Sequence, residues 1–407
     1  MIGGMSSRRL FAVFAMLAVV GAAPAPREGR VTLLEPYEAA TVTDKSLNVF
    51  RFKDLARIDP ARPKADGMNT QTLSLFGRED LIAGASDDYR ATGCAPVRGA
   101  GDVVEEIVRR ARTTSVVIVN ESHERSEHRG FTARLLVRLR AEGYTALAME
   151  ALSNPPPGSE LRYQPSFVRE PGLPYLDDED GFYLGEAAFG RLGRTAKRLG
   201  YALVPYEAQH DEATANKSES ESESERIAVR EEGQASALAA WIKTHPDAKL
   251  IVHVGYSHAT EVPRADGTRW MATRLRVKTG IDPLTISQTT CRGGGAAPRL
   301  ATLPAEEPVG TFDLVVDHPA ARFVHGRPAW RVAAGDVPVA IPAALRPAHG
   351  WRVIEARPEG ESPATVPMDR VAIWPGEDIA LLLPPGRYRL RVLDPSQAPV
   401  PADPAAS

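Results

Sequence analysis

The sequence predicts an α/β protein, with a mostly parallel sheet flanked by helices and a small β-rich appendage at the C-terminus. Between residues 101 and 304, short apolar runs rich in β-branched residues alternate with stretches of helical periodicity. Beyond about residue 305 the helical periodicity stops and strand-like runs remain. Alternation of this kind is typical of a parallel sheet with right-handed crossovers, whose strands are buried on both faces.

The expected elements follow one another in a regular order. Strand-like runs lie at 115–119, 145–149, 201–204, 250–254 and 284–286. Helical spacing of apolar residues occurs at 102–112, 131–142, 184–199, 226–243 and 270–278. Glycines close three of these helices, as is common at helix C-termini: Gly143, Gly200 and Gly280. The strand candidates of the appendage are 312–316, 371–374, 379–383 and 388–392.

Two insertions interrupt the alternation. Residues 154–183 hold three consecutive prolines and several aromatic residues, and a loop of that length is usually a lid or a binding segment. Residues 217–225 alternate Ser with Glu, which indicates a solvated, low-complexity stretch without chemistry of its own.

The length and composition indicate a globular protein of more than one part. A chain of 407 residues exceeds one ordinary core, and 25% charged residues is a normal globular value. A net charge of −3 does not suggest a nucleic-acid surface, so we expect a small-molecule or peptide substrate and no nucleic acid. We divide the chain into a signal peptide (1–25), a loop-rich lead-in packed on the core (26–100), an α/β domain that carries the site (101–304), a β-rich appendage (305–395) and a disordered tail (396–407).

The N-terminus has the layout of a signal peptide. Arg8 and Arg9 precede an apolar run at 10–20, and small residues follow. The run is too short to span a membrane comfortably, so we expect a periplasmic or secreted protein with no stable membrane anchor after processing. Disulfides persist in such compartments. Cys94 and Cys291 either form one bridge there or remain two separate thiols.

Titratable residues directly follow the first four strand-like runs. The first run leads into Glu121 and His123, and the second into Glu150. The third leads into Tyr206, Glu207 and, slightly later, His210; the fourth leads into Tyr256 and His258. Ligands of open parallel sheets bind at the carboxyl ends of the strands. Since neighbouring strands are about 4.8 Å apart, we expect these side chains to converge.

Three carboxylates at such short distances repel one another unless a cation, a proton or an arginine accompanies them. Arg129, with His128 beside it, and Arg230 are candidate counter-charges, and two histidines next to the carboxylates suit metal binding or proton transfer. A single Glu at a strand end is more often a helix cap or a surface residue. The repetition over four strands favours a functional site. His253 lies inside an apolar run, which predicts a core histidine.

These motifs resemble a known superfamily. Val119-Asn-Glu-Ser-His123, Glu150, Glu207 and Gly255-Tyr-Ser-His258 look like the motifs shared by erythromycin esterases, ChaN-like haem-binding proteins and Tiki-type metalloproteases. The resemblance covers roughly residues 100–290, and 226–231 is similar to the Arg-bearing helix that precedes the last His motif in the esterases. In this superfamily the first motif usually opens with Gly-Glu, whereas Asn120 precedes the Glu here.

The preferred functional hypothesis is an exported hydrolase of an ester, lactone or peptide, which activates water either directly or through a metal. His123 acts as general base, His258 as second base or ligand, and the glutamates orient the imidazoles, hold a metal or share protons. We assign catalysis to His123, Glu121, Glu150, Glu207 and His258, a metal to His123, His258, Glu121 and Glu150, and substrate binding to His128, Arg129, Tyr206, Tyr256 and Arg230. The resemblance also implies an alternative, a non-catalytic haem- or metal-binding protein of ChaN-like type, with Tyr206 and Tyr256 facing the iron. A structural member without activity is the third possibility.

Overall fold

The computed structural model describes residues 30–40, 47–64, 66–150, 152–182, 184–208 and 222–394. The expected signal peptide, the expected tail and His210 lie outside these residues. Within them, no helix combines the length and the apolar character that crossing a membrane requires.

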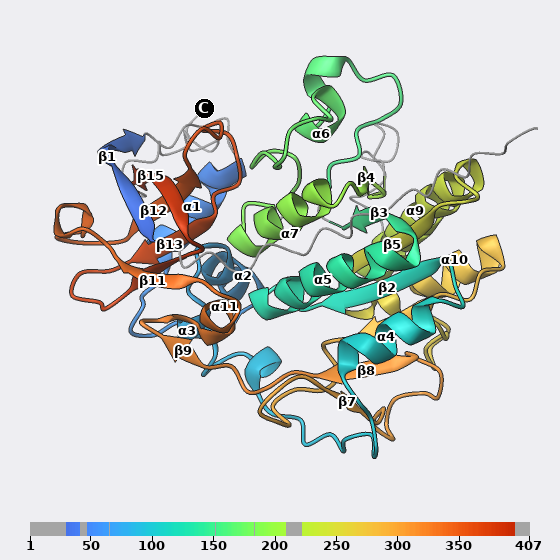
Figure 1. Cartoon of the computed structure of the whole chain (residues 1–407). Coiled ribbons are helices and arrows are strands. Elements are labelled where there is room, and N and C mark those ends of the chain that lie inside the picture. Colours follow the sequence, from blue (N-terminus) through green and yellow to red (C-terminus); the bar gives the residue numbers. More distant parts are fainter. Residues whose placement is uncertain are drawn as a thin grey trace, which may run out of the picture.

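A seven-stranded sheet carries the larger part of the molecule (Figure 1). Its strand order is β4–β3–β5–β2–β6–β8–β7, and all pairs are parallel except β7 with β8. This arrangement confirms the predicted α/β fold. The strands are β2 (Val116–Glu121), β3 (Tyr144–Met149), β4 (Ala202–Val204), β5 (Lys249–Gly255), β6 (Leu284–Ser287), β7 (Arg299–Ala301) and β8 (Leu314–Asp317).

Helices cover both faces of this sheet because successive strand residues point to opposite sides. Val117 and Val119 of β2 belong to one apolar cluster, and Val116 and Ile118 belong to another. The first cluster includes side chains of α4 (Val103–Ala111), α5 (Ser126–Leu139) and α7 (Ala187–Arg198); the second includes side chains of α9 (Glu223–Thr244) and α10 (Met271–Thr279).

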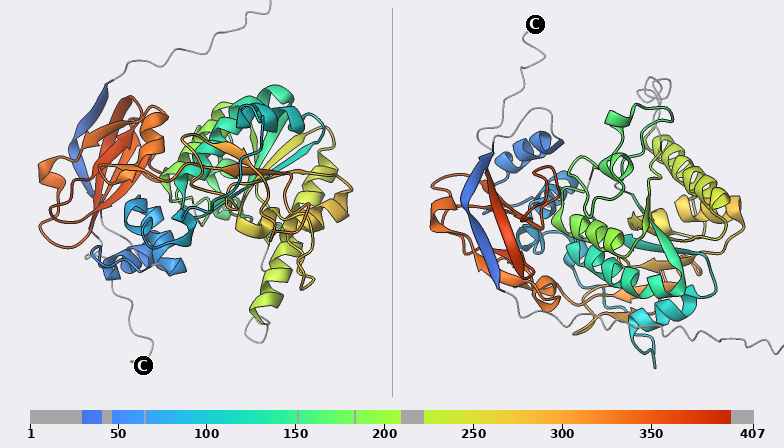
Figure 2. Two further views of the ribbon diagram at one scale, coloured as in Figure 1. Left: turned by 90° about the horizontal axis from the view of Figure 1, so that it is seen from below. Right: turned by 45° about the horizontal axis from the view of Figure 1, so that its top comes forward.

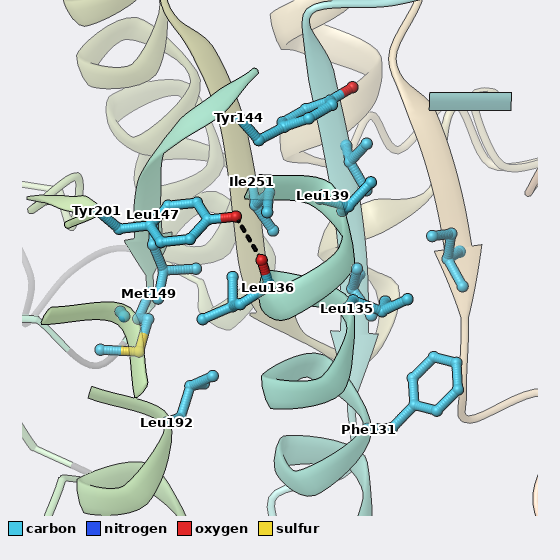
Figure 3. Close-up of a cluster of buried hydrophobic side chains, with 14 of the residues drawn as sticks. Phe131, Leu135, Leu136, Leu139, Tyr144, Leu147, Met149, Leu192, Tyr201 and Ile251 are labelled. Atoms are coloured by element: carbon cyan, nitrogen blue, oxygen red, sulfur yellow. Dashed lines mark hydrogen bonds between the residues drawn. The ribbon is translucent and has the colours of Figure 1, made fainter. Parts of the chain in front are cut away.

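Part of the first cluster is drawn in Figure 3, where side chains of α5, α7, β3 and β5 pack together. The Tyr201 hydroxyl donates a hydrogen bond of 2.7 Å to the carbonyl oxygen of Leu136, so this buried polar atom is satisfied. Burying the apolar side chains removes them from water and stabilises the layered arrangement.

Three helix starts differ from the sequence expectation by three residues or more, and α7 begins at Ala187 rather than at 184. The helix α5 begins at Ser126 rather than 131, because its first turn buries polar residues that interrupt the apolar pattern, namely His128 and Arg129. The helix α9 begins inside the Ser/Glu stretch. Ser222 and Glu225 form a capping box there, in which each side chain accepts a hydrogen bond from the other residue's backbone N–H.

A second, four-stranded sheet lies beside the α/β part (Figure 2). Its order is β1–β15–β12–β13, in which the N-terminal β1 runs parallel to the last strand. Its strands are β1 (Val31–Ala40), β12 (Arg352–Pro358), β13 (Asp369–Ile373) and β15 (Gly386–Leu393). Two smaller sheets have two strands each. In one, β9 (Phe323–Val324) pairs with β10 (Arg327–Pro328), and in the other, β11 (Val337–Ala340) pairs with β14 (Ala380–Leu383).

The two parts divide differently from the expected boundaries. The strand β8 pairs with β6 and β7, so residues beyond 305 still belong to the larger sheet. Part of the lead-in packs on the smaller sheet instead of on the α/β core, because Phe52 and Leu55 share a cluster with Trp351 and Val353. The lead-in helices are α1 (Leu47–Arg57), α2 (Gly67–Leu75), α3 (Glu79–Ile82) and the 3-10 helix η1 (Asp87–Tyr89).

Covalent and ionic contacts fix the lead-in and the insertion. A disulfide joins Cys94 to Cys291, with a Cα–Cα distance of 5.8 Å, so the two thiols do form the bridge left open by the sequence. The insertion contains η3 (Leu161–Tyr163) and α6 (Ser166–Arg169), and its Asp178 lies 3.1 Å from Arg370 of the smaller sheet.

Candidate active site

The strand order explains why the predicted site residues converge. The strand β5 lies between β2 and β3, and Glu121 at the end of β2 is paired in register with Gly255 at the end of β5. On the other side, the backbone N–H of Glu150 donates to the carbonyl of His253, at 3.0 Å. Glu121 and Glu150 therefore flank the carboxyl end of β5, which leads into η4 (Tyr256–Ala259) and His258.

Glu121 and His123 form the first carboxylate–imidazole pair. His123 Nδ1 is 2.9 Å from Glu121 Oε1, and Arg129 Nε is 2.7 Å from Glu121 Oε2. Burial disfavours the charged carboxylate, but Arg129 and the hydrogen bonds from His123 and His253 outweigh it and hold the pKa of Glu121 well below its usual range. An ionised Glu121 keeps the proton of a neutral His123 on Nδ1, so Nε2 becomes the acceptor of the ring.

Gly255 makes room for this imidazole. A Cβ atom at that position would lie 2.7 Å from His123 Nε2 and 2.9 Å from Glu150 Oε2. Both atoms therefore gather at one point above the end of β5. A side chain at residue 255 would displace the imidazole, the carboxylate or the strand.

His258 and Glu231 form the second carboxylate–imidazole pair. His258 Nδ1 is 2.6 Å from Glu231 Oε1, and His258 Nε2 is 3.5 Å from Glu150 Oε1. Burial lowers the pKa of His258, but the carboxylates of Glu150 and Glu231 outweigh that effect and raise it above its usual value. The other oxygen of Glu231 accepts a hydrogen bond of 2.6 Å from the N–H of Met271, at the first residue of α10.

Glu150 lies between the two imidazoles. Its Oε2 accepts a hydrogen bond of 2.6 Å from the backbone N–H of Gly255, and its Oε1 accepts a hydrogen bond of 2.7 Å from Arg230 Nη2. Burial would raise the pKa of Glu150, but His258, His123 and Arg230 together lower it to about 2. The carboxylate therefore carries its charge over the whole ordinary pH range.

Arg230 also pairs with the third glutamate, Glu207. Its Nε and Nη2 donate to the two oxygens of Glu207 at 2.9 and 2.6 Å, and Gln234 donates to the same carboxylate. Arg230 is also the most open of these residues, with 33% of its side chain exposed. Arginine partners, Arg129 on one side and Arg230 on the other, thus resolve the repulsion among the three glutamates.

The predicted metal ligands do not fit a metal ion. Among the residues that the structure describes, no three or more His, Cys, Asp or Glu side chains are arranged to hold one. The guanidinium groups of Arg129 and Arg230 contact the carboxylates of Glu121 and Glu150, which a cation would need. The assignment of His123, His258, Glu121 and Glu150 as a metal set therefore has no support in this geometry.

The predicted substrate-binding residues fall into two groups. Arg230 and Tyr256 lie at the site, and the ring of Tyr256 meets the ring of His123 edge-on, with centroids 5.2 Å apart. The other three are buried. Arg129 forms an ion pair with Glu121. His128 Nδ1 accepts a hydrogen bond of 2.9 Å from the backbone N–H of Ser122. Tyr206 belongs to the apolar cluster that includes side chains of α9.

Tyr256 is held in place by Asp88, which no sequence motif indicates, and by Asn120. Its hydroxyl donates 2.8 Å to Asp88 of η1, which also accepts a hydrogen bond from Ser122. The Asn120 side chain donates 2.8 Å to the Tyr256 carbonyl oxygen. Since Tyr256 has φ 39°, a left-handed conformation that is unfavourable for a non-glycine residue, this amide stabilises it. Asn120, the departure from the superfamily pattern, thus has a local role.

Two further site residues, Glu231 and His253, had no assigned role in the sequence analysis. Glu231 follows Arg230 directly, and a charged pair on a helix that packs against a site strand is the only indication in the sequence. His253 is buried as expected for a core histidine, but its Nε2 lies 3.3 Å from Glu121 Oε2, so it also helps to hold the first pair. Nothing in the sequence indicates that Asp88 is a site residue, because it lies in a loop-rich segment far from the strand-end motifs.

A cleft opens beside this centre. It has a volume of about 580 Å³ and is lined by Asp88, Tyr256 and Ser257 among others. Such a volume is within the ordinary range of small-molecule sites, about 300–1,000 Å³. Tyr256 belongs both to the cleft wall and to the surroundings of His123, so it connects the cleft to the two carboxylate–imidazole pairs.

Comparison with known proteins gives only distant likenesses. No protein-family model matches the chain, and no curated protein matches it. Among solved structures, the type III effector HopBA1 has a TM-score of 0.32 at 15% identity, covering 58% of this chain and 99% of that one. A structure of cofacial haem binding to ChaN of Campylobacter jejuni has a TM-score of 0.35 at 9% identity, covering 53% and 91%.

A third solved structure is RRSP, a MARTX toxin effector domain from Vibrio vulnificus. It has a TM-score of 0.33 at 14% identity, covering 59% of this chain and 44% of that one. At TM-scores this low, none of the three likenesses supports a conclusion about family or function. The superfamily resemblance of the sequence motifs stays a prediction.

Proposed function

We propose that the protein is a hydrolase that uses its two histidines as a general base and a general acid. One observation carries the proposal: each of two buried carboxylate–imidazole pairs has its ring next to the same carboxylate, Glu150. Carboxylates that hold imidazoles in one orientation and protonation state are the usual support for general acid–base catalysis.

The two imidazoles suit different tasks. His123 accepts a proton at Nε2 because Glu121 keeps the other proton on Nδ1. His258 has a raised pKa, so its charged form, the proton donor, persists to higher pH. Glu150 stays ionised between them and stabilises positive charge on either ring.

The proposed reaction is the addition of water across an ester, lactone or peptide bond. The water oxygen bonds to the carbonyl carbon while one of its protons moves to His123. The bond from that carbon to the leaving oxygen or nitrogen breaks as His258 delivers a proton to the leaving atom. The proton on His123 then returns to His258 through solvent. The proposed donor to the oxyanion is Nη1 of the partly exposed Arg230, which lies 3.4 Å from His258 Nε2 and makes no hydrogen bond with the carboxylates of Glu150 and Glu207.

The test is a hydrolysis assay of purified protein against an ester, a lactone and a fluorogenic peptide. We expect activity on one class, and a loss in kcat/KM of about 100-fold or more for His123→Ala and for His258→Ala. His245→Ala is the matched control, because this histidine is exposed at the end of α9 and should leave activity unchanged. Unchanged kcat/KM in a folded His123→Ala variant would contradict the proposal, as would no hydrolysis of any class.

The two tyrosines expected to face iron do not favour the haem-binding alternative. Tyrosine binds iron as a phenolate, but burial raises the pKa of both Tyr206 and Tyr256. Tyr206 is fully buried, and the Tyr256 hydroxyl is engaged by Asp88. Haem titration followed at the Soret band checks this. A 1:1 end point that is lost in Tyr256→Phe would favour haem binding over hydrolysis.

A further inference from the structure

A second cavity lies where α5 meets α11 (Ala329–Ala333), and none of its lining residues belongs to the candidate active site (Figure 1). Its volume is about 460 Å³, again within the usual range for small-molecule sites, about 300–1,000 Å³. Much of the wall consists of alanines, including Ala296, Ala297, Ala320, Ala321, Ala333 and Ala334. Short side chains without rotamers keep such a wall open, so the cavity is pre-formed.

Three aromatic side chains complete the apolar lining: Phe131, Phe323 and Trp330. Trp330 packs directly on the helix α5, because a Cβ atom at Gly130 would lie 2.3 Å from its ring. Its indole nitrogen donates 3.1 Å to the Ser126 hydroxyl, which fixes the ring orientation. Aromatic rings held in this way favour a flat apolar ligand, which can stack on a ring or meet its edge.

The charges at the cavity are unbalanced once internal pairs are removed. Glu127 pairs with Arg125, whereas the buried Glu79 carboxylate accepts hydrogen bonds only from the uncharged hydroxyls of Tyr89 and Ser126 and so offsets one positive charge of the lining. Two exposed arginines of the lining, Arg134 and Arg322, form no ion pair within the described part of the chain. The Arg134 guanidinium lies over the Phe131 ring, 5.2 Å from its centroid. Both guanidinium groups match a carboxylate in charge and in planar geometry.

We infer that this cavity binds a flat aromatic molecule that carries one carboxylate. The ring occupies the space beside Phe323 and Trp330, and the carboxylate contacts Arg322 and Arg134, the second of which lies over the buried Phe131 ring. This inference is independent of the proposed hydrolysis, because neither the cavity nor its charges involve the two carboxylate–imidazole pairs.

The experiment measures binding of 2-naphthoate to the whole purified protein by isothermal titration calorimetry. We expect one saturable site, and 2-naphthamide, with the same ring but no charge, should bind at least 10-fold more weakly. The double variant Arg134→Gln/Arg322→Gln should bind 2-naphthoate no better than 2-naphthamide. Arg138→Gln is the matched control: it lies one turn further along α5, pairs with Glu105 outside the cavity, and should leave the dissociation constant unchanged.

A second pair of variants tests the location. Ala333→Leu and Ala297→Leu each place a larger side chain on an exposed wall position, so the fold should tolerate them while the cavity fills. Either substitution should weaken 2-naphthoate binding at least 10-fold, with an unchanged thermal unfolding midpoint. No saturable binding to the unmodified protein would overturn the inference. Binding that is unaffected by the arginine variant, or by both leucine variants, would overturn it as well.

Discussion

Glu231 influences the pH dependence of the proposed reaction because its carboxylate raises the pKa of His258. Burial lowers the pKa of His258, but the carboxylates of Glu150 and Glu231 have the larger effect and raise it. Its charged form is therefore present below its ordinary pKa and persists above it, and is lost only as the pH rises through the raised value. In Glu231→Gln one carboxylate is lost, so the pKa of His258 should fall and the alkaline limb of the kcat/KM profile should move to lower pH.

The measurement is a pH–rate profile of hydrolysis for the wild type and Glu231→Gln. We expect kcat/KM to drop on the order of 10-fold at the alkaline end and much less at the acidic end. A uniform loss at all pH values would indicate a structural role only, since Glu231 also accepts the N–H of Met271. Glu232→Gln is the control, because this neighbouring glutamate pairs with Arg274 and Lys278 away from the histidines.

At the scale of elements, the Cys94–Cys291 bridge fixes the segment that carries Asp88. A hydrogen bond next to the bridge also holds this segment. The side chain of Arg292, the residue after Cys291, donates to the carbonyl oxygen of Asp87 at 2.7 Å. The double variant Cys94→Ser/Cys291→Ser should lose about 2–4 kcal/mol in free energy of unfolding, because the open chain gains conformational entropy. We also expect kcat/KM to fall roughly 10-fold at temperatures where the variant is folded, because Asp88 no longer restrains Tyr256.

Combining these substitutions with Asp88→Asn separates the two effects. If the bridge acts on the site through Asp88, its removal should cost little further activity in the Asp88→Asn background, although stability should still fall. Urea unfolding and the hydrolysis assay together give both quantities. Additive losses in activity would show that the bridge affects the site by another route.

The five helices and the first five strands of the α/β part could be predicted to within about five residues, since apolar periodicity reports which side chains are buried. The short strand β7 was not predicted. The pattern also placed Glu121, Glu150 and Glu207 at strand ends, and β2 and β5 are neighbours as that argument requires. Partners distant in the sequence could not be found in this way. Asp88 and β8 are examples, because a local pattern contains no information about which segment packs against it.

At the scale of the whole molecule, export is the remaining prediction from the N-terminal sequence. Cleavage should leave a protein that begins near residues 24–28, as the small residues after the apolar run indicate. N-terminal sequencing of material from the periplasm or the medium checks this. Recovery of protein that still starts at Met1 or Met5 in the soluble fraction would contradict it.

The absence of a side chain at Gly255 also gives a way to sort relatives of this protein. The backbone does not require glycine there, because residue 255 has an ordinary extended conformation with φ −76° and ψ 145°. What excludes alanine is the space taken by His123 and Glu150. A relative that has lost both this imidazole and this carboxylate is free to acquire a methyl group at this position, whereas one that keeps either side chain in the same place is not. Glycine or alanine at this one position should therefore distinguish relatives that keep the His123 and Glu150 arrangement from relatives that have lost it.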